Sequence, residues 1–177
     1  EALELVKKWK GKADDRITMM LGPHAPYTCP PGFLKEVVTA ARHYQLSIMI
    51  HVAETEDELA QIAKEYGKRP VAYLAEHGVF SRPVLVAHGV WLDEVELSYL
   101  SRQKVAVAHN PSSNMKLAAG IAPVEKMLSA KLLVGLGTDG AASNNRLDMF
   151  TEMRMAALLQ KAHTGNPSVL PAETVLK

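Results

Sequence analysis

The chain has 177 residues, of which 47% are hydrophobic and 22% charged, a composition suited to one packed domain and unlike that of a disordered segment. Its 20 Lys and Arg nearly balance its 19 Asp and Glu, which argues against nucleic-acid binding through bulk charge. The single cysteine, Cys29, excludes an internal disulfide framework and favours a reducing, cytoplasmic compartment. No apolar run reaches the roughly 18 residues that a membrane span needs.

Short apolar runs alternate with stretches of helical period along the whole chain. The run over 46–53 is typical of a strand buried on both faces, and the last helix is expected to turn Phe150, Met153, Ala157 and Leu159 inward. In chain order we expect a strand over 17–22, a helix over 31–45, a strand over 46–53, a helix from the capping box Thr55–Glu58 to Gly67, a short helix over 71–76, a strand over 84–90, a helix capped by Asp93 and Glu96 that ends near Gln103, a strand over 104–108, an irregular loop, a helix from Pro123, a strand over 132–137 and a helix over 147–162.

Five strand–helix units in succession predict a parallel sheet covered by helices, that is, an α/β fold. A doubly wound sheet would usually carry a glycine-rich phosphate loop, and the sequence contains neither common form of that loop. The other solution is an eight-stranded barrel, which typically needs about 250 residues. Five units in 177 residues therefore predict an incomplete (β/α)8 barrel.

Each predicted strand ends in a polar side chain that can carry chemistry. Side chains alternate along a strand, so His51 should share a face with Met49, and His88 should share one with Val84 and Val86. In a barrel, polar groups at strand ends meet at the carboxyl rim, where barrel active sites lie. We therefore expect one rim to gather His24, His51, His88, His109 and Asp139.

Histidine and aspartate together suit a divalent metal such as Zn²⁺ or Fe²⁺. Glu54 follows His51 closely enough to move protons beside such a metal, although a carboxylate there also suits the start of the next helix. The remaining histidines lie in or at the ends of predicted helices, where a structural role is expected; these are His43, His77 and His163.

Four motifs carry a resemblance to a known family. They are, in chain order, His51-Val-Ala-Glu54-Thr-Glu-Asp-Glu58, Ala87-His88-Gly-Val, His109-Asn-Pro-Ser-Ser-Asn-Met-Lys-Leu117 and Gly137-Thr-Asp139-Gly-Ala-Ala-Ser-Asn-Asn145. The sequence from about residue 16 onward resembles the amidohydrolase superfamily, in particular its methylthioadenosine/S-adenosylhomocysteine deaminase branch, which also holds the related triazine hydrolases.

The resemblance implies a role for each matching residue. His51 and Asp139 match metal ligands, and Asp139 also takes part in catalysis. His88 matches the histidine that helps activate water, and Glu54 the acid that contacts the substrate and carries a proton to its ring nitrogen. His24 matches a substrate contact, whereas His109 and Asn110 match residues that support the groups around the metal.

The resemblance also implies a longer enzyme. Residues 1–177 correspond to strands four to eight, the C-terminal part of a metal-dependent hydrolase barrel, without the first three strands and the small β-sandwich domain. The family's His-x-His ligand pair is absent, so we expect the 177 residues alone to be inactive.

The activity implied for the full-length enzyme is hydrolytic deamination of a 6-aminopurine nucleoside, of the methylthioadenosine, S-adenosylhomocysteine or adenosine type. It would use one divalent metal, Zn²⁺ or Fe²⁺, in a homo-oligomer that binds neither nucleic acid nor membrane. One alternative is a guanine, 8-oxoguanine or triazine hydrolase of the same superfamily. Another is a non-catalytic α/β module that binds a ligand without metal.

Overall fold

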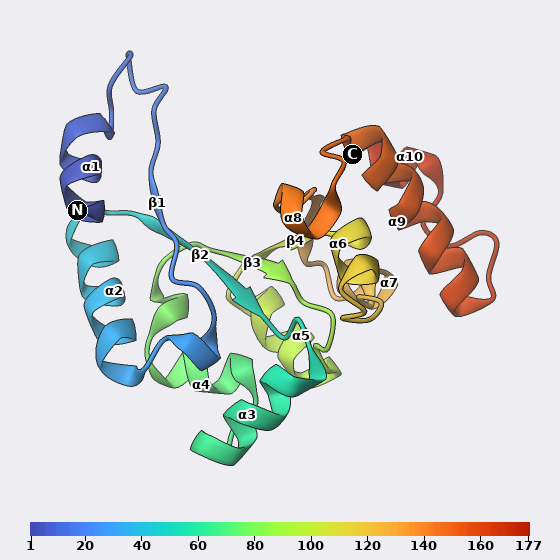
Figure 1. The fold of residues 1–177 in the computed structure, drawn as a ribbon, viewed down its shortest axis with the longest axis horizontal. Coiled ribbons are helices and arrows are strands. Elements are labelled where there is room, and N and C mark those ends of the chain that lie inside the picture. Colours follow the sequence, from blue (N-terminus) through green and yellow to red (C-terminus); the bar gives the residue numbers. More distant parts are fainter.

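A computed structural model describes residues 1–177 and contains one five-stranded parallel sheet (Figure 1). The strands lie side by side in chain order, so a right-handed helical crossover of the βαβ type is the expected connection between neighbours. β1 and β5 are free edges, as expected for an incomplete barrel. The strands are β1 (Met20–Leu21), β2 (Ser47–Val52), β3 (Val84–His88), β4 (Ala106–His109) and β5 (Leu133–Leu136).

Helices connect the strands and cover one face of the sheet (Figure 1). None of them combines the length and apolar character required to cross a membrane. The α-helices are α1 (Ala2–Trp9), α2 (Pro31–His43), α3 (Glu56–Tyr66), α4 (Pro70–Glu76), α5 (Glu94–Arg102), α6 (Pro111–Lys116), α7 (Val124–Ser129), α8 (Ala141–Asn144), α9 (Met149–Thr164) and α10 (Ala172–Leu176), and two short 3₁₀ helices are η1 (Pro26–Thr28) and η2 (Val79–Ser81).

All predicted strands and helices are present, but three details differ from the sequence expectation. β1 is only two residues long, because its sole neighbour is β2 and only Met20 and Leu21 pair with that strand. The stretch expected to be an irregular loop contains α6, whose proline occupies the first helical position. The helices α1, α8 and α10 were not expected.

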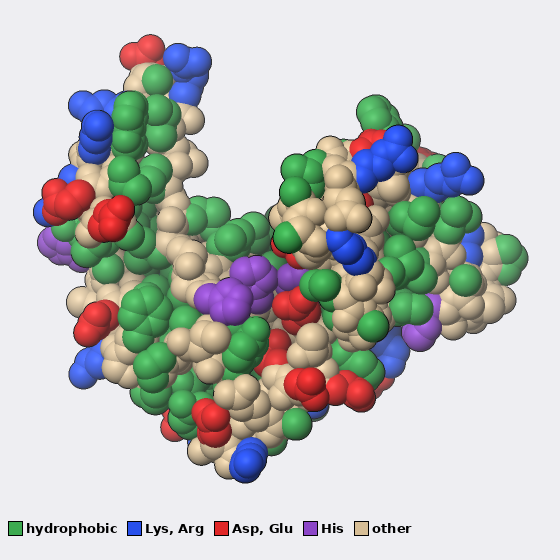
Figure 2. All heavy atoms as spheres, viewed as in Figure 1, with side chains coloured by type: hydrophobic (Ala, Val, Ile, Leu, Met, Phe, Trp, Pro, Cys, Tyr) green, Lys and Arg blue, Asp and Glu red, His purple; other side chains and the backbone are tan.

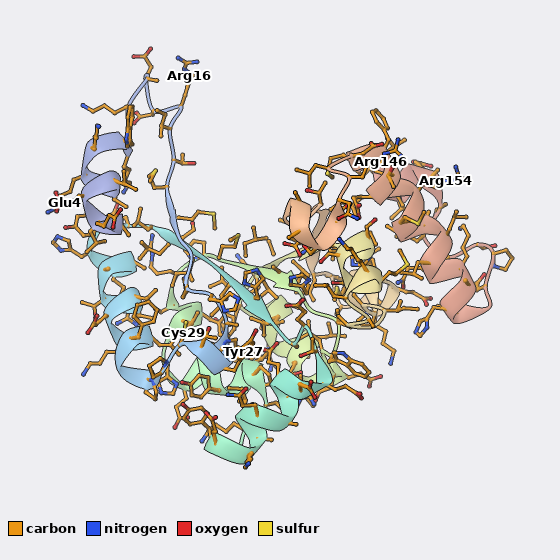
Figure 3. All side chains as sticks on the ribbon, viewed as in Figure 1. Glu4, Arg16, Tyr27, Cys29, Arg146 and Arg154 are labelled. Atoms are coloured by element: carbon orange, nitrogen blue, oxygen red, sulfur yellow. The ribbon has the colours of Figure 1, made fainter.

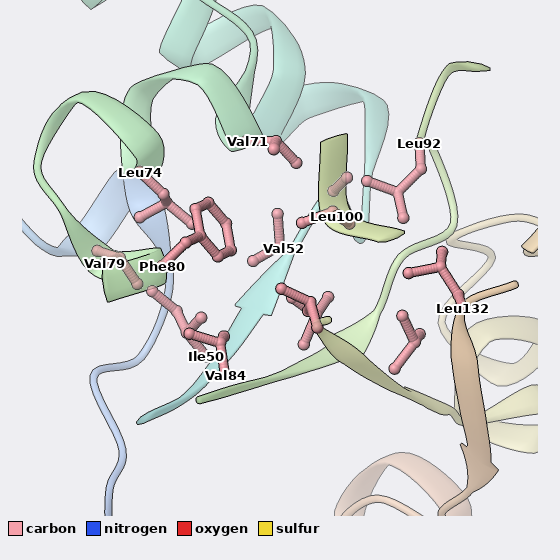
Figure 4. Packing of buried hydrophobic residues seen from close by; sticks show 14 of the residues in the cluster. Ile50, Val52, Val71, Leu74, Val79, Phe80, Val84, Leu92, Leu100 and Leu132 are labelled. Carbon is pink, nitrogen blue, oxygen red and sulfur yellow. The ribbon is translucent and has the colours of Figure 1, made fainter. Parts of the chain in front are cut away.

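The core lies between one face of the sheet and the helices that cover it (Figure 4). Ile48, Ile50 and Val52 of β2 are buried there, and Val86 and Val107 continue the layer on the next two strands. Burial of these branched side chains stabilises the fold by roughly 1.5–3 kcal/mol each.

The opposite face of the sheet is open to solvent. Met49 is 37% exposed and Leu133 is 72% exposed, although both lie within strands. The expectation that the strand over 46–53 is buried on both faces is therefore wrong, because nothing in these residues covers this side of the sheet.

The inward face of α9 is also different from the one expected. Phe150 is 81% exposed, whereas Met153, Ala157 and Leu159 are partly buried. The fully buried positions are Glu152, Ala156 and Gln160. This face of α9 turns inward because Glu152 and Gln160 form hydrogen bonds with neighbouring segments. Glu152 accepts from the Ser112 backbone N–H and the Asn144 amide, and Gln160 donates to the Ala122 carbonyl.

Candidate active site

Histidine side chains gather on the floor of a hollow between the N-terminal and C-terminal parts of the chain (Figure 2). The rings of His24 and His51 lie 5.1 Å apart between centroids, and those of His51 and His88 lie 5.4 Å apart in a stacked arrangement. These residues follow or end β1, β2 and β3. The carboxyl ends of neighbouring parallel strands thus bring three of the predicted residues together.

The His51 ring is fixed by the strand beside it. Its Nδ1 lies 2.7 Å from the His24 carbonyl oxygen, which also accepts the His51 backbone N–H at 3.0 Å. A carbonyl can only accept, so Nδ1 carries the hydrogen and Nε2 keeps its lone pair. Orientation by a backbone carbonyl is typical of metal-binding histidines.

His24 and its loop close one side of this group. Its Nδ1 lies 2.9 Å from the Thr28 hydroxyl, and its ring is exposed. Tyr27 meets the His24 ring edge-on at 5.8 Å, and Figure 3 shows Tyr27 close to the carboxyl end of β2. His24 can therefore reach a molecule in the hollow.

His88 reaches the site through its backbone conformation and not through strand alternation. Val84 and Val86 lie in the helix-side core, so the predicted shared face is wrong. His88 has a left-handed φ of 72°, which swings its ring to the side of His51. The ring is 1% exposed, and its Nδ1 lies 2.8 Å from Asn114 Oδ1.

Glu54 lies beside the free nitrogen of His88. Glu54 Oε2 is 3.7 Å from His88 Nε2, and the carboxyl group is mostly buried. Ala53, the residue before it, is left-handed, with φ of 52°. An acid and an imidazole at this separation can exchange a proton through small side-chain movements.

Glu58 holds the strand end from which Glu54 projects. Its two carboxyl oxygens accept the backbone N–H groups of Ala53 at 2.8 Å and Glu54 at 2.9 Å. Only half of the expected capping box forms. The Thr55 hydroxyl accepts the Glu58 backbone N–H, but the Glu58 carboxyl group does not accept the Thr55 backbone N–H. Burial raises the pKa of Glu58 to about 7, although these two hydrogen bonds oppose the shift.

Asp139 is oriented by hydroxyl and backbone donors. Oδ2 accepts from Ser113 at 2.6 Å and from Ser143 at 2.8 Å, and Oδ1 accepts the Gly140 N–H at 2.7 Å. Burial works to raise the pKa of Asp139, but these hydrogen bonds outweigh it and hold the pKa below its ordinary value. A carboxylate offers about four lone-pair positions, so one remains free.

His109 does not join this group. In the register of β4 and β5 it pairs with Leu136, and its ring lines a cavity of about 300 Å³ on the helix side of the sheet with Val134 and Met153. The expectation that five groups share one rim is wrong for His109, because alternation turns it away from the hollow. Burial lowers its pKa to about 4, and the charge of His88 adds to the effect.

Asn110 and the other histidines have structural positions. The buried Asn110 side chain lies against Gly137, where a Cβ atom would stand 2.4 Å from Asn110 Oδ1. His43 ends α2, His77 caps α4 and places Nδ1 2.7 Å from the Tyr73 carbonyl, and His163 lies at the end of α9, as expected.

The donors fit a divalent metal in kind but form an incomplete set. His51 presents a free Nε2 and Asp139 a free lone pair. No three His, Cys, Asp or Glu side chains come together as a group able to hold a metal ion. A catalytic zinc usually has three protein ligands, and these residues alone do not supply that number.

Four contacts of the site were not expected from sequence. They involve Glu58, Ser113, Asn114 and Ser143. All four residues lie within the motifs that carry the family resemblance, and Glu58 also occupies the last position of the capping box. The sequence motifs therefore contain these positions, but the hydrogen-bond partner of each side chain depends on the tertiary structure.

Polar side chains gathered at the carboxyl ends of parallel strands are the arrangement of α/β-barrel active sites. Residues 1–177 match the Amidohydrolase family, and the chain belongs to that family. The resemblance expected from the four motifs is thereby confirmed.

Two relatives have sequences similar to the whole chain. A 5-methylthioadenosine/S-adenosylhomocysteine deaminase of Desulforudis audaxviator is 57% identical over 177 residues, which are 100% of this chain and 41% of that protein. A 5'-deoxyadenosine deaminase of Methanothermobacter thermautotrophicus is 50% identical over 175 residues, 99% of this chain and 41% of that protein. The chain thus spans less than half the length of these relatives.

Solved structures share the fold over the same region. An adenosine deaminase from Xanthomonas campestris with bound zinc has a TM-score of 0.92 at 37% identity, covering 99% of this chain and 39% of that protein. A triazine hydrolase variant has a TM-score of 0.91 at 26% identity, also covering 99% and 39%. The five-stranded sheet is therefore part of a barrel of this family.

Proposed function

We propose that these residues belong to a metal-dependent hydrolase that deaminates a 6-aminopurine nucleoside carrying a 5' substituent, such as methylthioadenosine or S-adenosylhomocysteine. The observation that carries the proposal is the meeting of His51, Glu54 and His88 at adjoining strand ends. Relatives named for methylthioadenosine, S-adenosylhomocysteine and 5'-deoxyadenosine support the substrate class.

His51 and Asp139 would hold the metal, completed by a His-x-His pair from the rest of the full-length enzyme. A divalent metal at such a site acts as a Lewis acid that makes water a stronger nucleophile near neutral pH. The other steps fall to the protein's own side chains.

His88 and Asp139 would take the proton of the attacking water. His88 offers Nε2 as acceptor because Nδ1 bears the hydrogen, and Asp139 is held ionised by its three hydrogen bonds. The new carbon–oxygen bond then forms at the ring carbon that bears the amino group.

Glu54 serves as the proton carrier. It gives a proton to the adjacent ring nitrogen as water adds. It then takes a proton from the added hydroxyl group, which becomes the carbonyl, and passes it to the amino group as the carbon–nitrogen bond breaks. Ammonia leaves, and the purine becomes a ring carbonyl of the inosine type. His24 would contact the substrate, consistent with its exposed ring on the rim.

Glu54→Gln in the full-length enzyme tests this assignment. We expect kcat to fall by about 10²–10⁴, the usual contribution of a general acid–base group, with the zinc content unchanged. Ammonia release from a panel of adenosine-type nucleosides, guanine, 8-oxoguanine and triazines identifies the substrate class. Near-normal turnover of the variant would remove Glu54 from the mechanism, and an intact enzyme without metal or ammonia release would favour a binding module.

A further inference from the structure

The short helix α6 reaches two strand ends that are not neighbours in the sheet. Ser113 donates its hydroxyl hydrogen to Asp139, which follows β5, and Asn114 contacts His88, which ends β3. β4 lies between those two strands, and α6 follows β4. Backbone pairing cannot join β3 to β5 directly, so these adjacent side chains form the link.

We propose that α6 is the positioning element of the active site, in which Asn114 fixes the tautomer of His88 and Ser113 fixes the orientation of Asp139. The inference rests on the function proposed above. Both are positioning residues, because each acts through another side chain and neither needs to touch substrate.

The contact with Asn114 decides what His88 can do. Asn114 Oδ1 accepts the hydrogen of His88 Nδ1 at 2.8 Å, which leaves the lone pair on Nε2, the atom that lies 3.7 Å from Glu54. Asn114 Nδ2 has no partner, and both side chains are 1% exposed. With the amide reversed, His88 would carry its hydrogen on Nε2 and could not accept a proton there.

Ser113 acts on the carboxylate in a parallel way. Its hydroxyl is fully buried and occupies one lone pair of Asp139 Oδ2 at 2.6 Å. With Ser143 on the same oxygen and Gly140 on the other, the carboxylate has a single orientation. The remaining lone pair of Asp139 therefore has a fixed direction, and the side chain loses no further rotamer freedom when a metal binds to it.

Helix α6 is itself held in place by a side chain of α9. Glu152 of α9 is fully buried; one oxygen accepts the Ser112 N–H at 3.1 Å and the other accepts from the Asn144 amide at 2.8 Å. Asn144 also donates to the Thr138 carbonyl, next to Asp139, at 2.7 Å. α6 and the Asp139 loop therefore share one support and keep a fixed spacing.

Variants of the full-length, zinc-loaded enzyme test the role of Asn114. Asn114→Leu keeps the approximate side-chain shape without an acceptor, and Asn114→Asp restores one. We expect Asn114→Leu to lower kcat by about 10- to 100-fold with KM within about threefold, and Asn114→Asp to recover most of the loss. Ser112→Ala, whose side chain makes no hydrogen bond, is the matched control on the same helix.

Spectroscopy gives a readout that does not depend on activity. In enzyme labelled with ¹⁵N in histidine, we expect His88 to carry its hydrogen on Nδ1, and Asn114→Leu to produce a mixture of tautomers. A His88 ring with its hydrogen on Nε2, or unchanged kcat in a folded Asn114→Leu enzyme, would overturn the proposal. If the enzyme releases no ammonia from any nucleoside, the proposed function fails, but the tautomer measurement still decides the role of Asn114.

Ser113 is tested by zinc affinity. We expect Ser113→Ala to weaken Zn²⁺ binding by about 10- to 100-fold in competition with a chelator, and Ser113→Thr, which retains the hydroxyl, to stay closer to the original enzyme. Equal zinc affinity of Ser113→Ala and the original enzyme would refute its role in orienting Asp139.

Discussion

Glu58 makes the stability of this protein depend on pH in a predictable direction. The residue is 3% exposed, its carboxyl group accepts two backbone N–H groups, and burial raises its pKa from 4.5 to about 7. The folded state therefore binds a proton that the unfolded chain has already lost between these pH values. The stability that Glu58 contributes is complete below pH 4.5 and is lost as the pH rises through 7.

The size of the effect follows from the pKa change. One pKa unit corresponds to about 1.4 kcal/mol, so the interval from 4.5 to about 7 corresponds to about 3 kcal/mol of unfolding free energy. Glu58→Gln removes the ionisation but keeps the length of the side chain. We therefore expect the unfolding free energy of the variant, relative to that of the original enzyme, to rise by about 3 kcal/mol as the pH increases from 4.5 to 8.

Denaturant unfolding of the full-length enzyme and the variant at a series of pH values measures this difference. Glu65→Gln makes the same charge change on α3 at an exposed position, and we expect it to leave the pH profile unchanged. Parallel profiles for Glu58→Gln and the original enzyme would refute the reasoning, because they would mean that Glu58 ionises as it does in the unfolded chain.

Gly137→Ala should destabilise the enzyme by about 1–3 kcal/mol, because its Cβ would lie 2.4 Å from the buried Asn110 Oδ1. Thermal unfolding measures this, with Gly135→Ala as control, since a Cβ there meets nothing within 4 Å; equal stability of both variants would contradict the packing described. The 177 residues expressed alone should hold less than one Zn²⁺ per chain, release no ammonia and self-associate, because β1 and β5 are free edges and Leu133 is 72% exposed. Metal analysis, an ammonia assay and light scattering test this; a monomer with one Zn²⁺ and measurable turnover would be the contrary result.

The sequence by itself determined the order of the five strands and of the main helices between them, and it located several residues of the candidate site. Apolar runs located the five strands, caps such as Thr55 and Gly67 located the ends of α3, and His51, His88 and Asp139 were identifiable by their positions at strand ends. These features are local: hydrophobic period, capping chemistry and distance along the chain are all properties of neighbouring residues.

Tertiary structure decided which of those residues face one another. Alternation alone would place His88 in the core, but a left-handed backbone turns it toward His51, while His109 keeps its alternating position and faces the helices. α6 is short, and its role arises because Ser113 and Asn114 meet residues 26 positions away in opposite directions along the chain. Such pairings depend on the packing of whole strands and helices, so the pattern of adjacent residues does not specify them.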